Sequence, residues 1–304
     1  MKPALSFSQP LVSVITVNWN NAPVTCDLLR SIKEVNTYPN LEVIVVDNAS
    51  DEDPTAIFLA EYPQAKVIRT QTNLGFSGGN NEGIRAANGD YLFLVNNDTE
   101  FTPYLVENIL ETFSSYPRAG MVCPKFHYYF SKGTIEYAGY SPISIFTGRN
   151  FMIGCKEKDE GQYDEVRETD YAHGGGMMVS RKVVEEVGMM PEEFFLYYEE
   201  FDWSEQIRKK GFKIYCQPKA LIYHKESMTT GKMSPLKTFY LTRNRILFMR
   251  RNIPLPGLAV FILYFTFFTI PKNTLAFIVK KQMDHLRSFW RGIFWHFNSN
   301  IKFN

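Results

Sequence analysis

The chain has 304 residues, of which 45% are hydrophobic, so it can bury a sizeable core in one large or two small domains. Its formal net charge of +1 does not indicate a polyelectrolyte partner that binds the whole surface. The four cysteines, at positions 26, 123, 155 and 216, show no CxxC spacing, which argues against disulfides and a zinc site and favours reduced thiols in the cytosol.

Short apolar runs alternate with helical patterns through the first 115 residues. The start, residues 1–10, is polar and lacks the apolar segment of a signal peptide. Strands are predicted at 11–17, 41–46, 66–69 and 91–95, and helices at 23–35, 54–61, 78–87 and 103–115. This alternation predicts an α/β fold with a mostly parallel central sheet flanked by helices.

Polar clusters follow three of these strands, at residues 18–21, 47–50 and 96–98. Ligands of such sheets bind beyond the carboxyl ends of the strands, so a binding site is expected at this edge. Asp47 could accept a hydrogen bond from the N3–H of a pyrimidine, or it could belong to an ordinary loop or N-cap before Pro54.

Asn96-Asn97-Asp98 could hold a divalent cation that bridges diphosphate oxygens. Oxygen ligands suit Mg²⁺ or Mn²⁺. An Asx turn that caps the helix near Pro103 is the alternative interpretation.

A glycine-rich stretch, residues 73–81, leads into the third helix. Its backbone could approach a phosphate at the helix N-terminus, but a plain turn fits the pattern equally well. The stretch matches neither GxGxxG nor GxxxxGK[ST], so it supports neither a dinucleotide site nor a P-loop.

The middle of the chain, about 125–171, is irregular and rich in Tyr, Gly and Ser, which suggests strands and loops that bind an acceptor. His173 precedes three glycines, starting with Gly174 and Gly175, that would let an acceptor approach the backbone; a flexible turn is the alternative. Helices are predicted at 181–187 and 199–210.

Residues 194–203 place three carboxylates, Glu199, Glu200 and Asp202, next to an aromatic run. Such a cluster can raise the pKa of one carboxyl group and supply a general base, or it can simply favour a helix N-terminus. His224 follows an apolar run and is either a metal ligand or a structural histidine.

The C-terminal segment is basic, with twelve Lys and Arg residues and one acid, Asp284, from position 232 onward. A helix is predicted at 234–252, followed by an apolar run at 255–270 that Pro271 ends; continuing to 279 would reach the roughly 20 residues that span a bilayer. These features favour association with anionic lipid over nucleic acid. A packed helical hairpin or an oligomer interface is the alternative.

Six stretches, in the same order along about residues 11–252, resemble glycosyltransferase family 2 and its bacterial rhamnosyltransferase-like branch. They are VSVITVNWN (12–20), VIVVDNAS (43–50), NLGFSGGNNEGI (73–84), YLFLVNND (91–98), GGGMMVSR (174–181) and FFLYYEEFDWSEQIRKKG (194–211). The resemblance implies a Rossmann-like glycosyltransferase A-type fold and a metal-dependent, inverting hexosyltransferase.

The resemblance also implies roles for individual residues. Glu200 looks like the catalytic base, with Glu199 and Asp202 beside it. Asn96 stands where the family's DxD motif begins with Asp, so Asp98 must carry most of the metal binding, together with His224 and Asn96. The expected nucleotide-sugar site consists of Thr16, Asn18, Asn20, Asp47, Ser50, Asn73, Gly75, Gly78, Asn81 and Asn97. The expected acceptor site consists of His173, Gly174, Gly175 and Trp203.

We therefore expect a catalytic domain at 1–232, with a nucleotide-binding part at 11–123 and an acceptor-binding part at 124–232, and a membrane-associated tail at 233–304. The expected donor is a dTDP-, UDP- or GDP-sugar, with dTDP-rhamnose favoured. The expected acceptor is a polyprenyl-linked saccharide at the cytoplasmic face of the bacterial inner membrane, which the protein would bind as a peripheral or monotopic enzyme. A sugar-phosphate nucleotidyltransferase and a non-catalytic membrane saccharide-binding protein are the alternatives.

Overall fold

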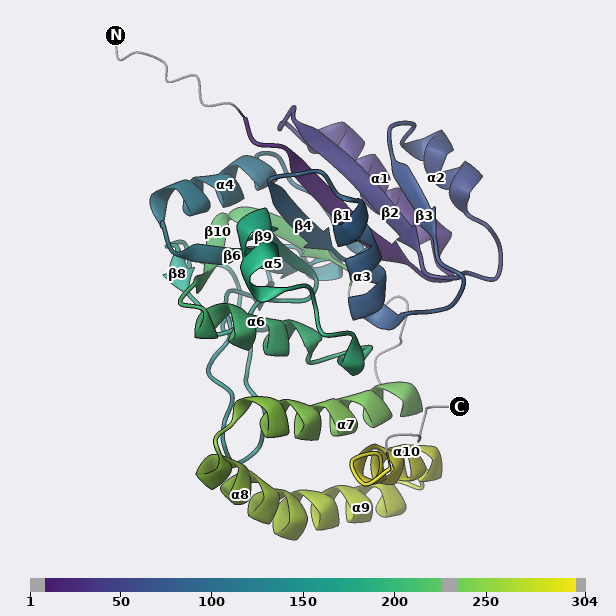
Figure 1. Cartoon of the computed structure of the whole chain (residues 1–304), viewed down its shortest axis with the longest axis vertical. Coiled ribbons are helices and arrows are strands. Elements are labelled where there is room, and N and C mark those ends of the chain that lie inside the picture. Colours follow the sequence, from purple (N-terminus) through teal and green to yellow (C-terminus); the bar gives the residue numbers. More distant parts are fainter. Residues whose placement is uncertain (1–8, 226–233, 299–304) are drawn as a thin grey trace.

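A computed structural model describes residues 9–225 and 234–298, which form an α/β body standing on a base of four helices (Figure 1). The predicted domain boundary at 232/233, most of the polar start at 1–10, and two of the basic residues, Lys232 and Lys302, lie outside the described residues.

The elements follow in a βα order through the first half and become mixed afterwards. In chain order they are β1 (Val12–Asn18), α1 (Ala22–Val35), β2 (Leu41–Asp47), α2 (Thr55–Glu61), β3 (Lys66–Arg69), α3 (Gly75–Ala86), β4 (Tyr91–Val95), β5 (Thr99–Glu100), α4 (Leu105–Ser115), β6 (Ala119–Tyr128), β7 (Ile135–Tyr137), β8 (Arg167–Glu168), β9 (Gly176–Ser180), α5 (Arg181–Val187), α6 (Glu199–Lys209), β10 (Lys213–His224), α7 (Pro235–Asn252), α8 (Leu255–Tyr264), α9 (Ile270–Val279) and α10 (Met283–Phe294).

One mixed sheet has the strand order β3-β2-β1-β4-β9-β6-β10-β5. The four N-terminal strands β1–β4 pair in parallel, as do β6 and β10. Strand β9 joins the two sets with antiparallel pairing on both sides. The expected α/β sheet flanked by helices is therefore confirmed, and its carboxyl edge is formed by the ends of β1, β2 and β4.

The structure differs from the sequence-based expectation in three places. Helix α3 begins at Gly75, three residues before the predicted start. Strand β6, which is ten residues long and buried along nearly all of its length, was not predicted; it begins at Ala119 and ends at Tyr128, inside the region expected to be irregular. Pro271 does not end the apolar helix, because a π-helical turn at Phe265–Thr269 precedes it and Pro271 lies in the first turn of α9, where its missing N–H costs little.

Two apolar cores hold the molecule together. The larger core lies between the sheet and its helices. The smaller core joins the body to the base, because Tyr171, Tyr198 and Phe201 pack with Phe248 of α7 and Phe261 of α8. The base is therefore built into the body, and helix α6 lies between the sheet and α7 (Figure 1).

Candidate active site

The ends of β1 and β2 form a connected polar network. Asn18 and Asp47 are paired in register, and the Asn18 amide donates to Oδ1 of Asp47 at 2.8 Å and to the Ser50 hydroxyl at 3.1 Å. The backbone N–H of Asn20 donates to the same hydroxyl at 2.8 Å. Arg69 forms an ion pair with Oδ2 of Asp47 at 3.2 Å. The Asp47 carboxylate is therefore fully buried and held by protein groups on both oxygens.

Sequence reasoning missed Arg69, although a signal for it was present. Arg69 ends β3, and β3 lies parallel to β2 with Arg69 in register with Asp47. Asp47 was predicted as a site residue because it lies at the carboxyl end of a parallel strand, and the same reason applies to Arg69 at the end of β3.

The predicted glycine-rich residues fall into two groups. Asn73 and Gly75 lie beside the carboxyl end of β2, because the amide of Asn48, the residue after β2, donates to Oδ1 of Asn73 and to the Gly75 carbonyl, each at 3.0 Å. Asn81 differs, since its amide donates to the Met190 carbonyl at 2.9 Å and its oxygen accepts from the Met190 N–H at 3.1 Å. In this structure Asn81 thus fastens the loop that contains Met190.

Two further predicted residues on this side are enclosed by protein. A Cβ at Gly78 would lie 2.6 Å from Cβ of Leu74, so this glycine permits close packing within the turn. Thr16 is fully buried in β1, and its hydroxyl has no hydrogen-bond partner within the described ranges 9–225 and 234–298.

The loop after β4 brings Asn97 and Asp98 toward this edge. The Asn97 amide donates to the Thr25 hydroxyl at 3.0 Å, and that hydroxyl donates to the Asn18 amide oxygen at 2.9 Å. Nε2 of His224 lies 3.2 Å from Oδ1 of Asp98, so the two predicted metal ligands are neighbours although 126 residues separate them.

Glu136 completes this group and was missed by sequence reasoning. Its carboxylate contacts Nδ1 of His224 at 2.9 Å, which aims Nε2 at Asp98. Burial lowers the pKa of His224, but the hydrogen bonds with Asp98 and Glu136 outweigh burial and raise this pKa to about 10. Glu136 lies in β7, within the stretch predicted to be irregular, and no motif marks it.

His173 and its glycines connect this group to the glutamates of α6. Nε2 of His173 lies 3.8 Å from Glu136. The Asn96 N–H donates to the Gly175 carbonyl at 3.0 Å, and a Cβ at Gly174 would lie 3.8 Å from Cδ of Glu200. Glu200 and the loop that carries Asp98 therefore border the same short segment, 173–175. Burial lowers the pKa of His173 to about 3, so its imidazole is neutral.

Glu199 and Glu200 open α6, with one carboxylate oxygen of each buried and lacking a hydrogen-bond partner in the described part of the chain. Burial raises the pKa of Glu200 to about 7, against the opposing effect of nearby backbone N–H groups. Burial and the charge of Glu200 raise the pKa of Glu199 well above its ordinary value. A carboxyl group whose pKa lies near 7, as for Glu200, suits a general base at neutral pH.

Asp202 and Trp203 do not belong to this site. Asp202 is fully buried in an ion pair with Arg251, with N–O distances of 3.0 and 3.2 Å, and accepts a hydrogen bond from Asn252 at 2.6 Å. Trp203 is 1% exposed and donates from its indole to the Gly188 carbonyl at 2.9 Å. Both expectations are corrected: these side chains anchor α6 to α7 and to the core.

A strained turn positions the two glutamates. Phe195, Tyr197 and Tyr198 all have φ between 65° and 74°, which is costly for residues with a Cβ. The amide nitrogen of Asn244, in α7, donates to the carbonyls of Phe194, Leu196 and Tyr197 at 2.7 to 2.9 Å. Asn244 is fully buried, and sequence reasoning did not select it.

Gly75 supports the same turn from the other side. Its φ is +72°, and a Cβ there would lie 2.3 Å from the Phe195 carbonyl oxygen, which leaves room only for glycine. That carbonyl accepts a hydrogen bond from the Phe76 N–H at 2.6 Å. The α3 N-terminus therefore contacts the turn before α6.

The described residues contain no group of three or more His, Cys, Asp and Glu side chains arranged to hold a metal ion. Asp98 and His224 still provide a carboxylate and an oriented imidazole. A pair of protein ligands fits Mg²⁺ or Mn²⁺ when substrate phosphates supply further oxygens.

A cavity of about 500 Å³ lies away from these residues. It is lined by Glu193, Leu247, Arg250, Arg251, Trp295, His296 and Phe297, and none of the predicted site residues lines it.

Comparison with known proteins identifies related sequences. The family model described as Glycosyl transferase family 2 matches residues 13–188. A low-salt glycan biosynthesis hexosyltransferase of Haloferax volcanii is 28% identical over 78% of this chain and 74% of its own. An N-acetylglucosaminyl-diphospho-decaprenol L-rhamnosyltransferase of Mycobacterium tuberculosis is 22% identical over 73% and 78%, and a dTDP-rhamnosyl transferase of Shigella flexneri is 24% identical over 75% and 76%.

Solved structures of similar fold come from the same class of enzyme. A mannosyltransferase of Pyrobaculum calidifontis, solved with GDP-mannose and Mn²⁺, superposes with a TM-score of 0.60 at 14% identity and covers 97% of this chain and 89% of its own. At this identity the likeness shows the fold alone, and the expected glycosyltransferase A-type fold is confirmed.

Removal of the Asn244 amide should destabilise the protein. In Asn244→Ala, three buried carbonyl groups lose their shared donor while the turn stays strained, so the free energy of unfolding should fall by about 2–4 kcal/mol. Urea denaturation measures this. Asn108→Ala is the matched control, because its amide donates to the exposed Lys219 carbonyl at 3.0 Å, and it should cost less than about 1 kcal/mol. Equal losses would contradict a special role for Asn244.

Proposed function

This chain belongs to glycosyltransferase family 2, and from that premise we propose that it transfers a sugar from a nucleotide-sugar donor to a hydroxyl group of a lipid-linked saccharide, with inversion at the anomeric carbon. We further propose dTDP-rhamnose as the donor and a polyprenyl-diphosphate-linked saccharide as the acceptor. The names of the mycobacterial and Shigella relatives support these two choices.

One observation carries the proposal. Glu200 is half-buried, with one enclosed carboxylate oxygen and a pKa raised to about 7, and it lies against the 173–175 segment that also contacts the loop of Asp98. A proton acceptor and a pair of cation ligands thus border one short stretch of backbone. This is the arrangement that a single displacement between a phosphorylated donor and a hydroxyl acceptor needs.

The reaction follows from these positions. Glu200 accepts the proton of the acceptor hydroxyl while that oxygen attacks the anomeric carbon, and the bond from that carbon to the nucleoside diphosphate breaks. Asp98 and His224, held by Glu136, would bind the divalent cation. When bound, that cation stabilises the negative charge that develops on the departing diphosphate. Burial and the charge of Glu200 raise the pKa of Glu199 well above its ordinary value, which favours the negative charge on Glu200.

We assign the nucleotide to the edge formed by Asn18, Asp47 and Asn97, within residues 11–123, and the acceptor to the segment that includes His173, within 124–232. The tail at 233–304 would then attach the enzyme to the cytoplasmic face of the bacterial inner membrane. A panel of dTDP-, UDP- and GDP-sugars, assayed for transfer to synthetic lipid-linked saccharides with and without Mn²⁺, tests the whole assignment.

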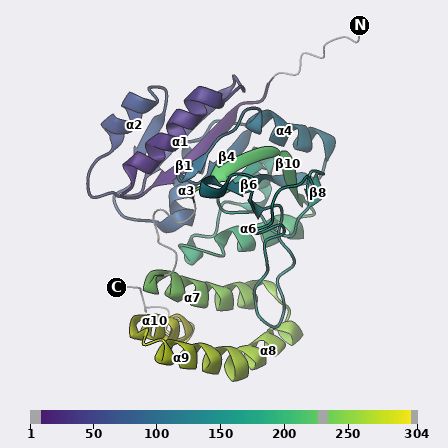
Figure 2. The same ribbon diagram turned by 180° about the vertical axis from the view of Figure 1, so that it is seen from behind.

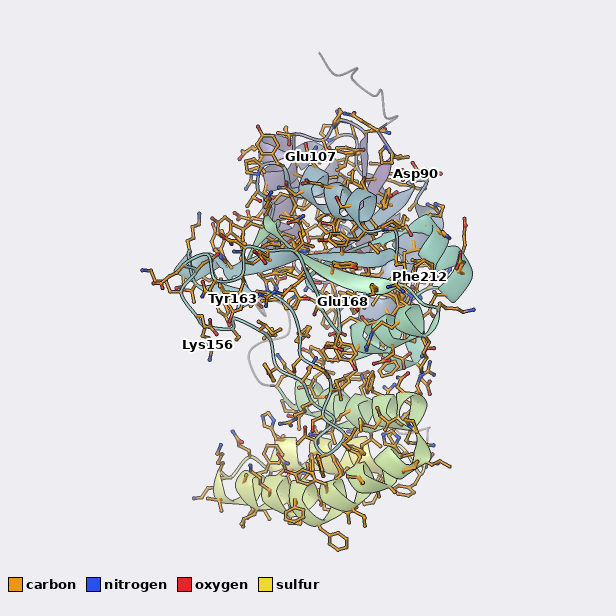
Figure 3. The ribbon with its side chains drawn as sticks, turned by 90° about the vertical axis from the view of Figure 1, so that its left-hand side faces the viewer. Asp90, Glu107, Lys156, Tyr163, Glu168 and Phe212 are labelled. Atoms are coloured by element: carbon orange, nitrogen blue, oxygen red, sulfur yellow. The ribbon has the colours of Figure 1, made fainter. Side chains whose placement is uncertain are left out.

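The base supports a membrane-bound acceptor. From Leu255 to Val279 the chain is long and apolar enough to cross a bilayer, yet only 11% of its most apolar 18-residue window is buried. Phe267 and Phe268 are 68% and 63% exposed. Figure 1 shows this helical stretch lying across the base, beside α7 and α10. Asp90 and Glu107, labelled in Figure 3, lie at the opposite end of the molecule.

We propose that this stretch lies in the plane of the interface. Lys272 lies within it, and placing one Lys at the centre of a spanning helix costs about 2.5–3.5 kcal/mol or more. The neighbouring helix α7 carries several arginines and would enter the hydrocarbon with it. In-plane binding avoids both costs, because lysine side chains can reach the headgroups.

Replacement of the proposed base should stop transfer without loss of the donor site. In Glu200→Gln, kcat should fall on the order of 10²–10⁴-fold, while the donor Kd measured by titration stays within about twofold. In the wild type, kcat/KM should rise with pH to a plateau with a midpoint near 7, because the carboxylate must be deprotonated to accept the proton. Glu186→Gln, an exposed change on α5, is the control.

Two outcomes would contradict this mechanism. One is retained activity in Glu200→Gln with an unchanged pH profile. The other is product NMR that shows retention at the anomeric carbon, because a single displacement inverts it.

Loss of the Glu136 carboxylate should weaken cation binding. Glu136→Gln keeps the shape but removes the charge that orients His224, so the Kd for Mn²⁺ should rise about 10–100-fold. Mn²⁺ binding is measured by electron paramagnetic resonance of the free ion. Glu157→Gln is the control, because that side chain bonds the exposed Tyr163 hydroxyl. Equal Mn²⁺ affinity in both variants would exclude Glu136 from this role.

Polar substitution on the base should detach the protein from vesicles. Phe267→Ser combined with Phe268→Ser removes two exposed aromatic side chains, and binding to anionic vesicles in flotation should weaken on the order of 100-fold. The control, Ile57→Ser with Leu59→Ser, changes exposed apolar residues of α2 in the body. Unchanged flotation of the phenylalanine variant would contradict membrane binding through this helix.

A further inference from the structure

A buried guanidinium without an anionic partner lies where the base meets the body. Arg245, in α7, is 4% exposed, and its Nε is buried with no hydrogen-bond partner. Within residues 9–225 and 234–298 it forms no hydrogen bond or ion pair, and its guanidinium lies 4.7 Å from the centre of the Phe265 ring. A buried unpaired charge is costly, so its presence calls for a reason.

Other buried cations of this protein have acceptors. Lys125 pairs with Asp159 at 2.7 Å and with Asp164 at 2.8 Å. Lys225 pairs with Asp27 and Glu100 at 2.7 and 2.9 Å. Arg243, two residues before Arg245, donates to the carbonyl of Glu193. The Nε of Arg243 is buried without a partner, like that of Arg245, but Arg243 still has this carbonyl as an acceptor. Among these buried cations, only Arg245 has neither a carboxylate nor a carbonyl as partner within residues 9–225 and 234–298.

A long loop, residues 139–153, carries a second arginine, Arg149, toward Arg245. Residues 139–153 leave the body and return, with backbone hydrogen bonds between Ser141 and Phe151 and between Ser144 and Arg149. Figure 2 shows this loop descending from the body to α8. At its tip Gly148 has φ of +61°, and a Cβ there would lie 3.0 Å from Cγ of Arg245. The loop tip thus covers the stem of Arg245.

Arg149, the next residue of the loop, is exposed. Burial lowers the pKa of Arg245 to about 10, and the charge of Arg149 acts in the same direction. The positive charge of Arg149 therefore acts on Arg245, and within residues 9–225 and 234–298 neither arginine forms an ion pair with a carboxylate. This arrangement favours an anion with several oxygens, because guanidinium groups bind phosphate oxygens in pairs.

The same point adjoins the proposed catalytic base. The Tyr198 hydroxyl donates to the Gly148 carbonyl at 2.8 Å, and Tyr198 directly precedes Glu199 and Glu200. On the other side lies the apolar base: Phe261 would contact a Cβ at Gly148 at 3.1 Å, and Phe146 of the loop packs edge-on to Tyr264 of α8. An anion at this point would lie between the helices of the base and the carboxylate of Glu200.

We propose that Arg149 and Arg245 bind the diphosphate of the lipid-linked acceptor. The lipid chain then lies along exposed α8, and the saccharide extends toward Glu200. This inference rests on the proposed function, because it assigns the acceptor's charged group to a part of the same site. Since Arg245 is nearly enclosed, the diphosphate enters beneath the tip of the 139–153 loop. An anionic phospholipid headgroup offers similar oxygens, and the test separates the two sources.

Stability distinguishes a ligand-binding arginine from a structural one. Arg245→Met keeps an unbranched apolar stem but removes the unpaired charge. The full-length variant, without ligand, should melt at the same temperature as the wild type or higher. Farnesyl diphosphate in mild detergent should raise the melting temperature of the wild type and not that of the variant. A lower melting temperature with an unchanged response to farnesyl diphosphate would overturn the proposal.

Binding measurements complete the test. The Kd for farnesyl diphosphate should rise at least tenfold in both Arg149→Ala and Arg245→Met. It should stay unchanged in Arg287→Ala, which removes an exposed arginine of α10, and uncharged farnesol should not discriminate among the variants. An unchanged Kd in both test variants would overturn the proposal. An equal loss of binding to phosphatidylglycerol vesicles would also overturn it, by identifying a phospholipid headgroup site.

The readouts separate this inference from the proposed function. If no nucleotide sugar supports transfer, the proposed function fails. The farnesyl diphosphate measurements would still test whether Arg149 and Arg245 bind a diphosphate. If transfer occurs and its KM for a diphosphate-linked acceptor is the same in wild type and Arg149→Ala, the anion site fails alone.

Discussion

The contact between Asn244 and the turn before α6 is the constraint on which the proposed site depends. One side-chain amide holds three carbonyl groups of a turn in which three non-glycine residues have left-handed backbone angles. Without this contact the turn would relax, and Glu199 and Glu200 would move with it. Because Asn244 comes from α7, a helix outside the sheet determines where the proposed base stands. Helix α7 is therefore part of the proposed catalytic architecture as well as of the proposed membrane contact.

The sequence predicted the N-terminal half well, because each element there is local and marked. Strands β3 and β4 begin and end as expected, and polar residues mark the carboxyl ends of β1, β2 and β4. The second half was harder, since β6, β9 and β10 contain glycine, proline, lysine and histidine and pair with strands far away in the chain. These strands are buried by tertiary packing, and the local pattern of hydrophobic residues does not indicate that burial.

Residue types were easier to predict than side-chain directions. Glu200 and Asp202 were grouped because both are acidic and close in sequence. Residues two apart on a helix point to different sides, and here one carboxylate lies beside Gly174 while the other pairs with Arg251. Asn81 and Trp203 illustrate the same limit, since both match a family stretch while their side chains fasten loops. Glu136 and Asn244 stayed hidden for the opposite reason, because neither lies in a marked stretch and both gain importance only through the fold.

Helix α7 links three features that would otherwise be separate. Its Asn244 holds the turn of the proposed base, its Arg245 lies at the proposed diphosphate site, and its Phe248 packs in the core that joins body and base. Consecutive helix residues point about 100° apart, so Asn244 and Arg245 face different neighbours from adjacent positions. A lipid anion that settles against Arg245 would therefore be bound one residue from the group that fixes Glu200. On this view the four-helix base does more than raise the local concentration of acceptor at the membrane. It also sets the distance between the membrane-bound phosphate and the Glu200 carboxylate, which receives the proton.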